Sequence, residues 1–109
     1  MSQGARPSQE EIFSDVETIW KSYVDAVEQS LERLQQEIEE AGRNSQVCTE
    51  QWCMDTDRML GEFVHILYSM YVPSFVSREY GRKLEVLKRK VHDLYTRFLT
   101  ISSTQARPR

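Results

Sequence analysis

Apolar residues recur in steps of three and four along most of the chain, the spacing that places side chains on one face of an α-helix. The first stripe ends at Ala41, and Gly42 follows as a residue that commonly terminates a helix. Ser8 and Glu11 form a capping-box pattern, which predicts a helix start there. The first predicted helix therefore covers residues 8–41. Its stripe comprises Phe13, Val16, Trp20, Tyr23, Val27, Leu31, Leu34, Ile38 and Ala41.

A second stripe follows after a short connection, where Asn44 or Ser45 can cap a new helix. Pro73 lacks a backbone donor and disfavours helical geometry at Val72. The second predicted helix therefore covers residues 45–72. Its main apolar positions are Trp52, Thr56, Met59, Phe63, Leu67 and Met70.

The third stripe has the most regular spacing in the chain, with alternating steps of four and three. Ser74 or Ser77 can cap its start, so the third predicted helix covers residues 75–101. The stripe comprises Tyr80, Leu84, Leu87, Val91, Leu94, Phe98 and Ile101.

Three helices with tight connections predict an all-α fold, an antiparallel up-down-up three-helix bundle with long, coiled-coil-like helices. A single domain over residues 8–101 is long enough to bury one modest core. We expect disordered tails at residues 1–7 and 102–109, the second of them basic. The same pattern is compatible with a helical hairpin whose third helix pairs with another chain.

Charge is divided unequally between the first and third predicted helices. Residues 8–41 carry ten acids and two bases, whereas residues 77–101 carry seven bases and three acids. Opposite charge favours a side-by-side arrangement and contributes to orientation more than to stability. The asymmetry therefore predicts that these two helices are neighbours.

The segment 63–76 is too apolar for a surface helix, since ten of its fourteen residues are apolar or aromatic. We predict that part of it binds a protein partner, either another helical protein or a second copy of this chain. One alternative is that the segment is bundle core. Insertion into a membrane interface is a weaker alternative, because the second helix lacks a lysine-rich polar face. The predicted partner-binding residues are Val64, Tyr68, Tyr71, Val72, Phe75 and Val76.

Basic residues of the third predicted helix support a second hypothesis, contact with the phosphates of a nucleic acid. The formal net charge of the whole chain is −3, and the acidic first helix can neutralise these bases. We therefore rank nucleic-acid binding behind protein binding. The bases concerned are Arg82, Lys83, Lys88, Arg89 and Lys90.

Catalytic and metal-binding patterns are weak. Glu62 and His65 have the Glu-x-x-His spacing of di-iron bundles, but the second such pair that these sites need is missing. Cys48 lies near a predicted helix start, where a thiolate is favoured, and a histidine could in principle activate it. The simpler interpretation is a small helical residue. We expect no enzymatic activity, no metal, no cofactor and no small-molecule substrate.

Cysteine content and the start of the chain predict a reducing compartment. On a helix, Cys48 and Cys53 point about 140° apart, which disfavours a disulfide between them. The first residues have no apolar core of the kind found in a signal peptide. We expect an intracellular protein, cytoplasmic or nuclear, that serves as an adaptor or small structural subunit of a larger complex.

Overall fold

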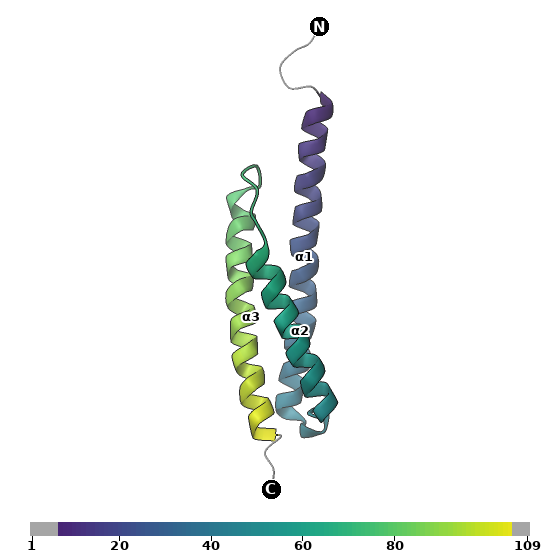
Figure 1. Cartoon of the computed structure of the whole chain (residues 1–109), viewed down its shortest axis with the longest axis vertical. Helices are drawn as coiled ribbons and strands as arrows, with labels where there is room; N and C mark the ends of the chain where they lie inside the picture. Colours follow the sequence, from purple (N-terminus) through teal and green to yellow (C-terminus); the bar gives the residue numbers. More distant parts are fainter. Residues whose placement is uncertain (1–6, 106–109) are drawn as a thin grey trace.

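The computed structural model describes residues 7–105, which form three α-helices and one short 3-10 helix (Figure 1). The α-helices are α1 (Pro7–Arg43), α2 (Glu50–Ser69) and α3 (Arg78–Gln105), and the 3-10 helix is η1 (Ser45–Val47). α1 and α3 run in one direction and α2 in the other. The predicted all-α, up-down-up bundle is therefore confirmed, and α3 packs within the chain against both other helices.

The outer ends of α1 and α3 differ from the predicted ends. α1 begins at Pro7, a residue suited to the first helical position, so Ser8 lies inside the first turn and is not the cap. The helix continues through Gly42, and α3 continues to Gln105, so residues 102–105 are helical rather than part of a tail. The predicted disorder at residues 1–6 and 106–109 lies outside the described residues.

Capping side chains define the entry into α2. The Asn44 carboxamide oxygen accepts a hydrogen bond from the backbone N–H of Gln46, at 3.0 Å, and so caps η1. The hydroxyl of Thr49 accepts one from the N–H of Trp52, also at 3.0 Å, and so caps α2. The second helix therefore begins later than predicted, at Glu50, because η1 occupies the first turn of the predicted range.

α2 also ends earlier than predicted, at Ser69 rather than at residue 72. Met70 has an extended backbone conformation, with ψ of 133°. Pro73 accounts only for the loss of helix immediately before it. A tertiary contact acts further back, because the indole N–H of Trp20 donates a hydrogen bond to the carbonyl of Tyr71, at 3.2 Å. This bond engages the backbone of the α2–α3 loop (residues 70–77) with α1.

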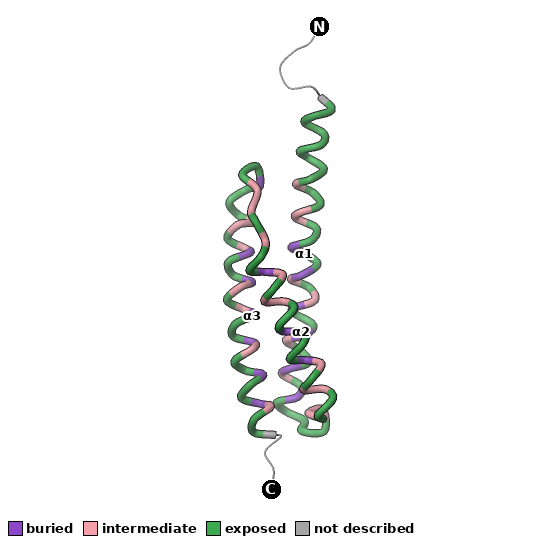
Figure 2. The backbone as a smooth tube through the Cα atoms, in the orientation of Figure 1, coloured by how far each residue is buried: buried purple, intermediate pink, exposed green. Residues whose placement is uncertain are grey.

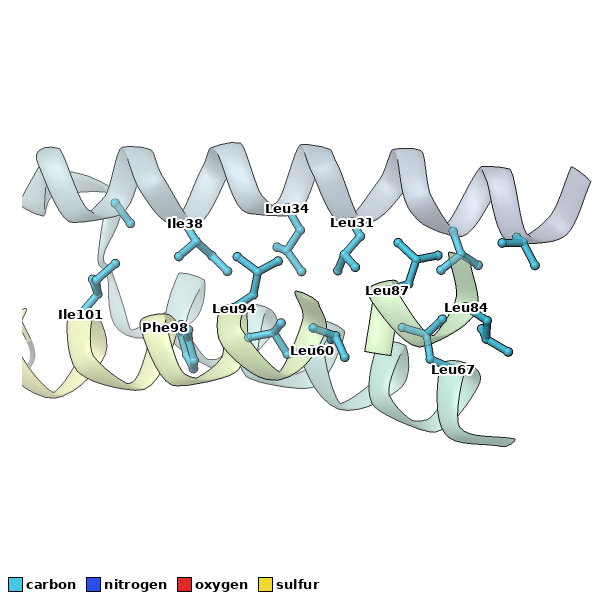
Figure 3. Close-up of a cluster of buried hydrophobic side chains, with 14 residues drawn as sticks. Leu31, Leu34, Ile38, Leu60, Leu67, Leu84, Leu87, Leu94, Phe98 and Ile101 are labelled. Atoms are coloured by element: carbon cyan, nitrogen blue, oxygen red, sulfur yellow. The ribbon is translucent and has the colours of Figure 1, made fainter. Parts of the chain in front are cut away.

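A single seam of apolar side chains forms the core between the three helices (Figure 3). In α1 the buried residue is Val24 and not Tyr23, and in α2 it is Leu60 and not Met59, so these two predicted positions are wrong. Every predicted position of α3 is buried except half-buried Tyr80. The core cluster comprises Val24, Val27, Leu31, Leu34, Ile38, Ala41, Leu60, Leu67, Leu84, Leu87, Val91, Leu94, Phe98 and Ile101.

Ion pairs link the acidic α1 to the basic α3. The ammonium of Lys83 lies 2.6 Å from a carboxylate oxygen of Asp25 and 2.9 Å from one of Glu28. The guanidinium of Arg97 lies 3.9 Å from the carboxylate of Glu39. The predicted pairing of these oppositely charged helices is therefore confirmed.

Candidate partner-binding surface

The loop 70–77 carries four of the six residues predicted to bind a partner. Val76 is only 7% exposed, so its assignment to a docking surface is wrong. Val72 is half-buried and packs against the core cluster. Tyr71, at 77% exposed, and Phe75, at 40%, remain at the surface, and a role for them in binding stays a prediction.

The N-terminal part of α1 exposes apolar side chains that the sequence analysis placed in the core or did not single out. α2 ends well short of this part of α1 and does not cover it (Figures 1 and 2). We call residues 8–23 of α1 the extension. Its exposed large apolar residues are Ile12, Phe13, Val16, Ile19 and Tyr23.

The first predicted stripe has one irregularity, a second consecutive step of four from Val27 to Leu31, and this irregularity is the sequence signal for the extension. If Val24 rather than Tyr23 is counted as the core-facing residue, the steps from Trp20 to Ala41 alternate regularly between four and three. Tyr23 then belongs to a second stripe together with Ile12, Val16 and Ile19, which lies about 70° around the helix from the core-facing residues. The two stripes overlap in the sequence, and the structure separates them.

The second stripe lies on one side of α1, and in the C-terminal half of α1 that same side faces α2. Val16, Tyr23, Ser30 and Glu37 are spaced by seven residues, so they share one side of the helix. The carboxylate of Glu37 accepts a hydrogen bond from the indole N–H of Trp52 on α2, at 3.2 Å. Toward the N-terminus the same side of α1 has no α2 beside it. The exposed stripe therefore borders the position that α2 would occupy if it continued.

Aromatic contacts hold the loop beside the extension. The rings of Phe13 and Phe75 lie with centroids 5.5 Å apart. Trp20, which bonds the carbonyl of Tyr71, also meets the ring of Tyr80 edge-on, with centroids 6.1 Å apart. These contacts join loop and helix into one apolar surface. We call it the extension surface, and it consists of Ile12, Phe13, Val16, Ile19, Tyr23, Tyr71 and Phe75.

The charge around this surface is predominantly negative. The extension carries four acids and one base, and that base, Lys21, pairs with Glu17 at 3.3 Å. At the same end of the molecule, the first turns of α3 carry Arg78 and Arg82 (Figure 1). The acidic extension thus lies at the same end of the molecule as two arginines of α3.

The other two predicted partner-binding residues, Val64 and Tyr68, line a separate groove of about 570 Å³ between α2 and α3. Leu99 and Tyr95 line it from α3. The ammonium of Lys88 lies 5.2 Å from the ring centre of Tyr68, a cation–π contact. The structure therefore distributes the predicted residues over two surfaces and the interior.

A polar contact ties the two walls of this groove together. The hydroxyl of Tyr95 donates a hydrogen bond to the carboxylate of Asp57, at 2.7 Å. This bond, together with burial, raises the pKa of Tyr95 above its ordinary value. The two walls of the groove are thus joined by a side-chain hydrogen bond within the chain.

Lys83, one of the bases predicted to contact a nucleic acid, is engaged inside the chain. Its hydrogen bonds to Asp25 and Glu28 raise the pKa of the ammonium above its ordinary value. The bond from Lys83, opposed by burial, lowers the pKa of Asp25 below its ordinary value. A phosphate contact by Lys83 would require this cluster to open.

The remaining bases do not form an uninterrupted positive surface. Lys88 pairs with Glu85 at 3.3 Å. Glu39 interrupts the surface hollow where Arg89 and Lys90 lie. Arg82 and Arg89 are exposed and Lys90 is half-buried.

The candidate catalytic and metal-binding residues do not come together. Glu62 and His65 are both exposed, and residues 7–105 contain no cluster of three or more side chains suited to a metal ion. Burial raises the pKa of the Cys48 thiol, which donates a hydrogen bond to the carbonyl of Ala41, at 3.4 Å. The expectation that its position favours a thiolate is therefore wrong. Cys48 and Cys53 are both free thiols.

Within the described part of the chain, no helix combines the length and the apolar character that a membrane span requires. Comparisons with protein-family models, curated proteins and solved structures give no match. Fold and surface together define a small all-α bundle whose first helix extends, uncovered, beyond its second.

Proposed function

We propose that this chain is a non-catalytic protein-interaction module, an adaptor or small structural subunit, that binds a helix of a partner chain through the extension surface. One observation carries the proposal: α1 continues past the end of α2 and exposes an apolar stripe at helical spacing. Helices with such a stripe typically pack against another helix, and each covers the apolar face of the other.

The size of the extension surface supports this proposal. Fully exposed large apolar side chains present ~200 Å² each, so the exposed fractions of its seven residues amount to roughly 700–800 Å². Contiguous apolar patches of this size on a single chain commonly mark interaction sites. Four of the seven residues are tyrosine or phenylalanine, from two different elements, and tyrosine is frequent among the residues that dominate binding energy.

Co-purification from cells tests the proposal. Ile19→Asp and Tyr71→Asp each place a charge on the extension surface, and Ile19 is 67% exposed, so the fold tolerates the change. Thr18→Asp is the matched control, because Thr18 is exposed and points about 100° away from Ile19. We expect both surface variants to lose the proteins that the wild-type chain retains, and the control to keep them.

Circular dichroism of the same variants must show unchanged helical content, so that loss of binding is not loss of folding. A Tyr68→Asp variant tests the α2–α3 groove in parallel. If both extension variants keep every wild-type partner, the extension surface is not the binding site and the proposal fails.

A further inference from the structure

We infer that the extension surface binds a second copy of this chain, and that each copy places its extension in the position beyond the end of the other copy's α2. The inference rests on the proposed function and names its partner. It predicts an end-to-end dimer in which the two extensions lie antiparallel to each other.

The direction of the helices favours this occupant. α2 runs antiparallel to α1, so a helix that continues its position must also run antiparallel to the extension. A second copy related by a two-fold axis perpendicular to α1 presents its own extension in that direction. Each copy then supplies the same exposed stripe to the other, as a closed symmetric interface requires.

The exposed stripe is compatible with the same two-fold axis. An axis beside Val16 places Ile12 of one copy opposite Ile19 of the other, because these two positions are nearly equidistant from it in the sequence. Ile12, Val16 and Ile19 therefore lie near one another across the axis, whereas Tyr23 lies opposite Ser8 or Gln9 at the edge of the interface. Tyr71 and Phe75 lie beside the extension and border the same interface.

The area is also sufficient. The extension surface exposes roughly 700–800 Å² of apolar side chain on each copy, and a stable interface of standard size buries ~800 Å² per partner. If the second copy covered this surface completely, its apolar side chains alone would account for nearly all of the area of such an interface.

Charge determines how the dimer responds to salt. Each extension carries four acids and one base, so two antiparallel extensions repel each other, while Arg78 and Arg82 of each copy lie at the same end and offset part of this repulsion. Salt screens the repulsion, so self-association should strengthen as ionic strength rises. Binding of a basic helix from a different protein to the same acidic surface would instead weaken as ionic strength rises.

Light scattering on a sizing column provides the first test, with the purified chain at concentrations up to ~100 µM. We expect the mass to rise from 12.9 kDa toward twice that value as concentration increases, and to do so more readily in high salt. Val16→Glu and Ile19→Asp should return the mass to 12.9 kDa, while Thr18→Asp should leave the dimer intact.

Disulfide trapping tests the symmetry independently of affinity. With oxidised glutathione as the oxidant, Val16→Cys, beside the proposed axis, should form a disulfide with its counterpart in the second copy, whereas Thr18→Cys, on the opposite side of the helix, should not. Peptide mapping separates these products from bonds of Cys48 or Cys53.

Two results would overturn the inference. One is a wild-type chain that stays monomeric at every concentration and salt level, and the other is a dimer that survives both Val16→Glu and Ile19→Asp. Neither result decides the proposed function, which fails only if the extension variants also keep all of their partners in the co-purification experiment.

Discussion

Thr56 is a buried polar residue in the core, and replacing it with valine should stabilise the chain. Its side chain is 0% exposed, and its hydroxyl has no hydrogen-bond partner among the described residues. A hydroxyl buried without a partner loses its hydrogen bonds to water and gains nothing in exchange, at a cost of ~1–3 kcal/mol. Thr56→Val keeps the branched shape and exchanges the hydroxyl for a methyl group.

The expected change in the free energy of unfolding can be attributed to the hydroxyl, because Thr56→Val leaves the other contributions nearly unchanged. Threonine and valine have similar helix propensities and both are stiff at χ1, so the local cost of the helix stays the same. We expect the free energy of unfolding to rise by ~1–2 kcal/mol. For a domain of about this length, that corresponds to a rise in Tm of roughly 5–15 °C.

Urea and thermal unfolding, followed by far-UV circular dichroism, measure this change. Thr56→Ser is the matched control, because it keeps the hydroxyl and removes the methyl group, and it should lower stability by ~1 kcal/mol. A valine variant less stable than wild type would refute the reasoning, since it would mean that the hydroxyl forms a hydrogen bond in solution. The measurements belong at one protein concentration, because dimerisation would also shift Tm.

Four further predictions follow from single residues. Gly61→Ala should raise the free energy of unfolding by up to ~1 kcal/mol, because an added methyl group meets nothing within 4 Å and glycine is a poor helix former. Gly42→Ala should gain less in the same unfolding assay, since its methyl group would lie 3.0 Å from the guanidinium of Arg97. Lys83→Met should lower stability by ~0.5–1 kcal/mol at neutral pH, because the ion pairs it removes are partly exposed. The lowered pKa of Asp25 contributes stability that is complete above its ordinary pKa of 3.8, and acid titration of unfolding should show this part lost as pH falls toward the lowered value.

The sequence was sufficient to predict the parts of the fold that rest on periodicity. The stripe of α3 is regular and covered along its length, so its interior residues from Leu84 to Ile101 are predicted correctly. The charge difference between α1 and α3 predicts their pairing, which Lys83 and Arg97 confirm. In these cases the same residues determine the local structure and its packing.

Helix ends and the binding surface depend on contacts between distant segments, which periodicity does not contain. The end of α2 lies before Pro73, near the place where Trp20, fifty-one residues before Tyr71, bonds the loop. Tyr23 and Val24 are adjacent apolar residues; regular spacing favours Val24 as the core residue, but the exposure of Tyr23 depends on where α2 ends. Phe13, Val16 and Tyr23 were therefore predicted to share one stripe with the core residues of the first helix, because the second helix was predicted to continue to residue 72.

The length difference between α1 and α2 has local causes in the sequence. α1 has no interior proline, and the apolar stripe of the extension keeps helical spacing up to its first turns. At the end of α2, the hydroxyl of Ser69 donates a hydrogen bond to the carbonyl of His65, Met70 turns extended, and Pro73 excludes a further turn. The same chain thus continues one helix with an apolar stripe and ends the helix beside it. Such a stripe is favourable only when covered, so the two features together favour a function in which a second helix completes the bundle.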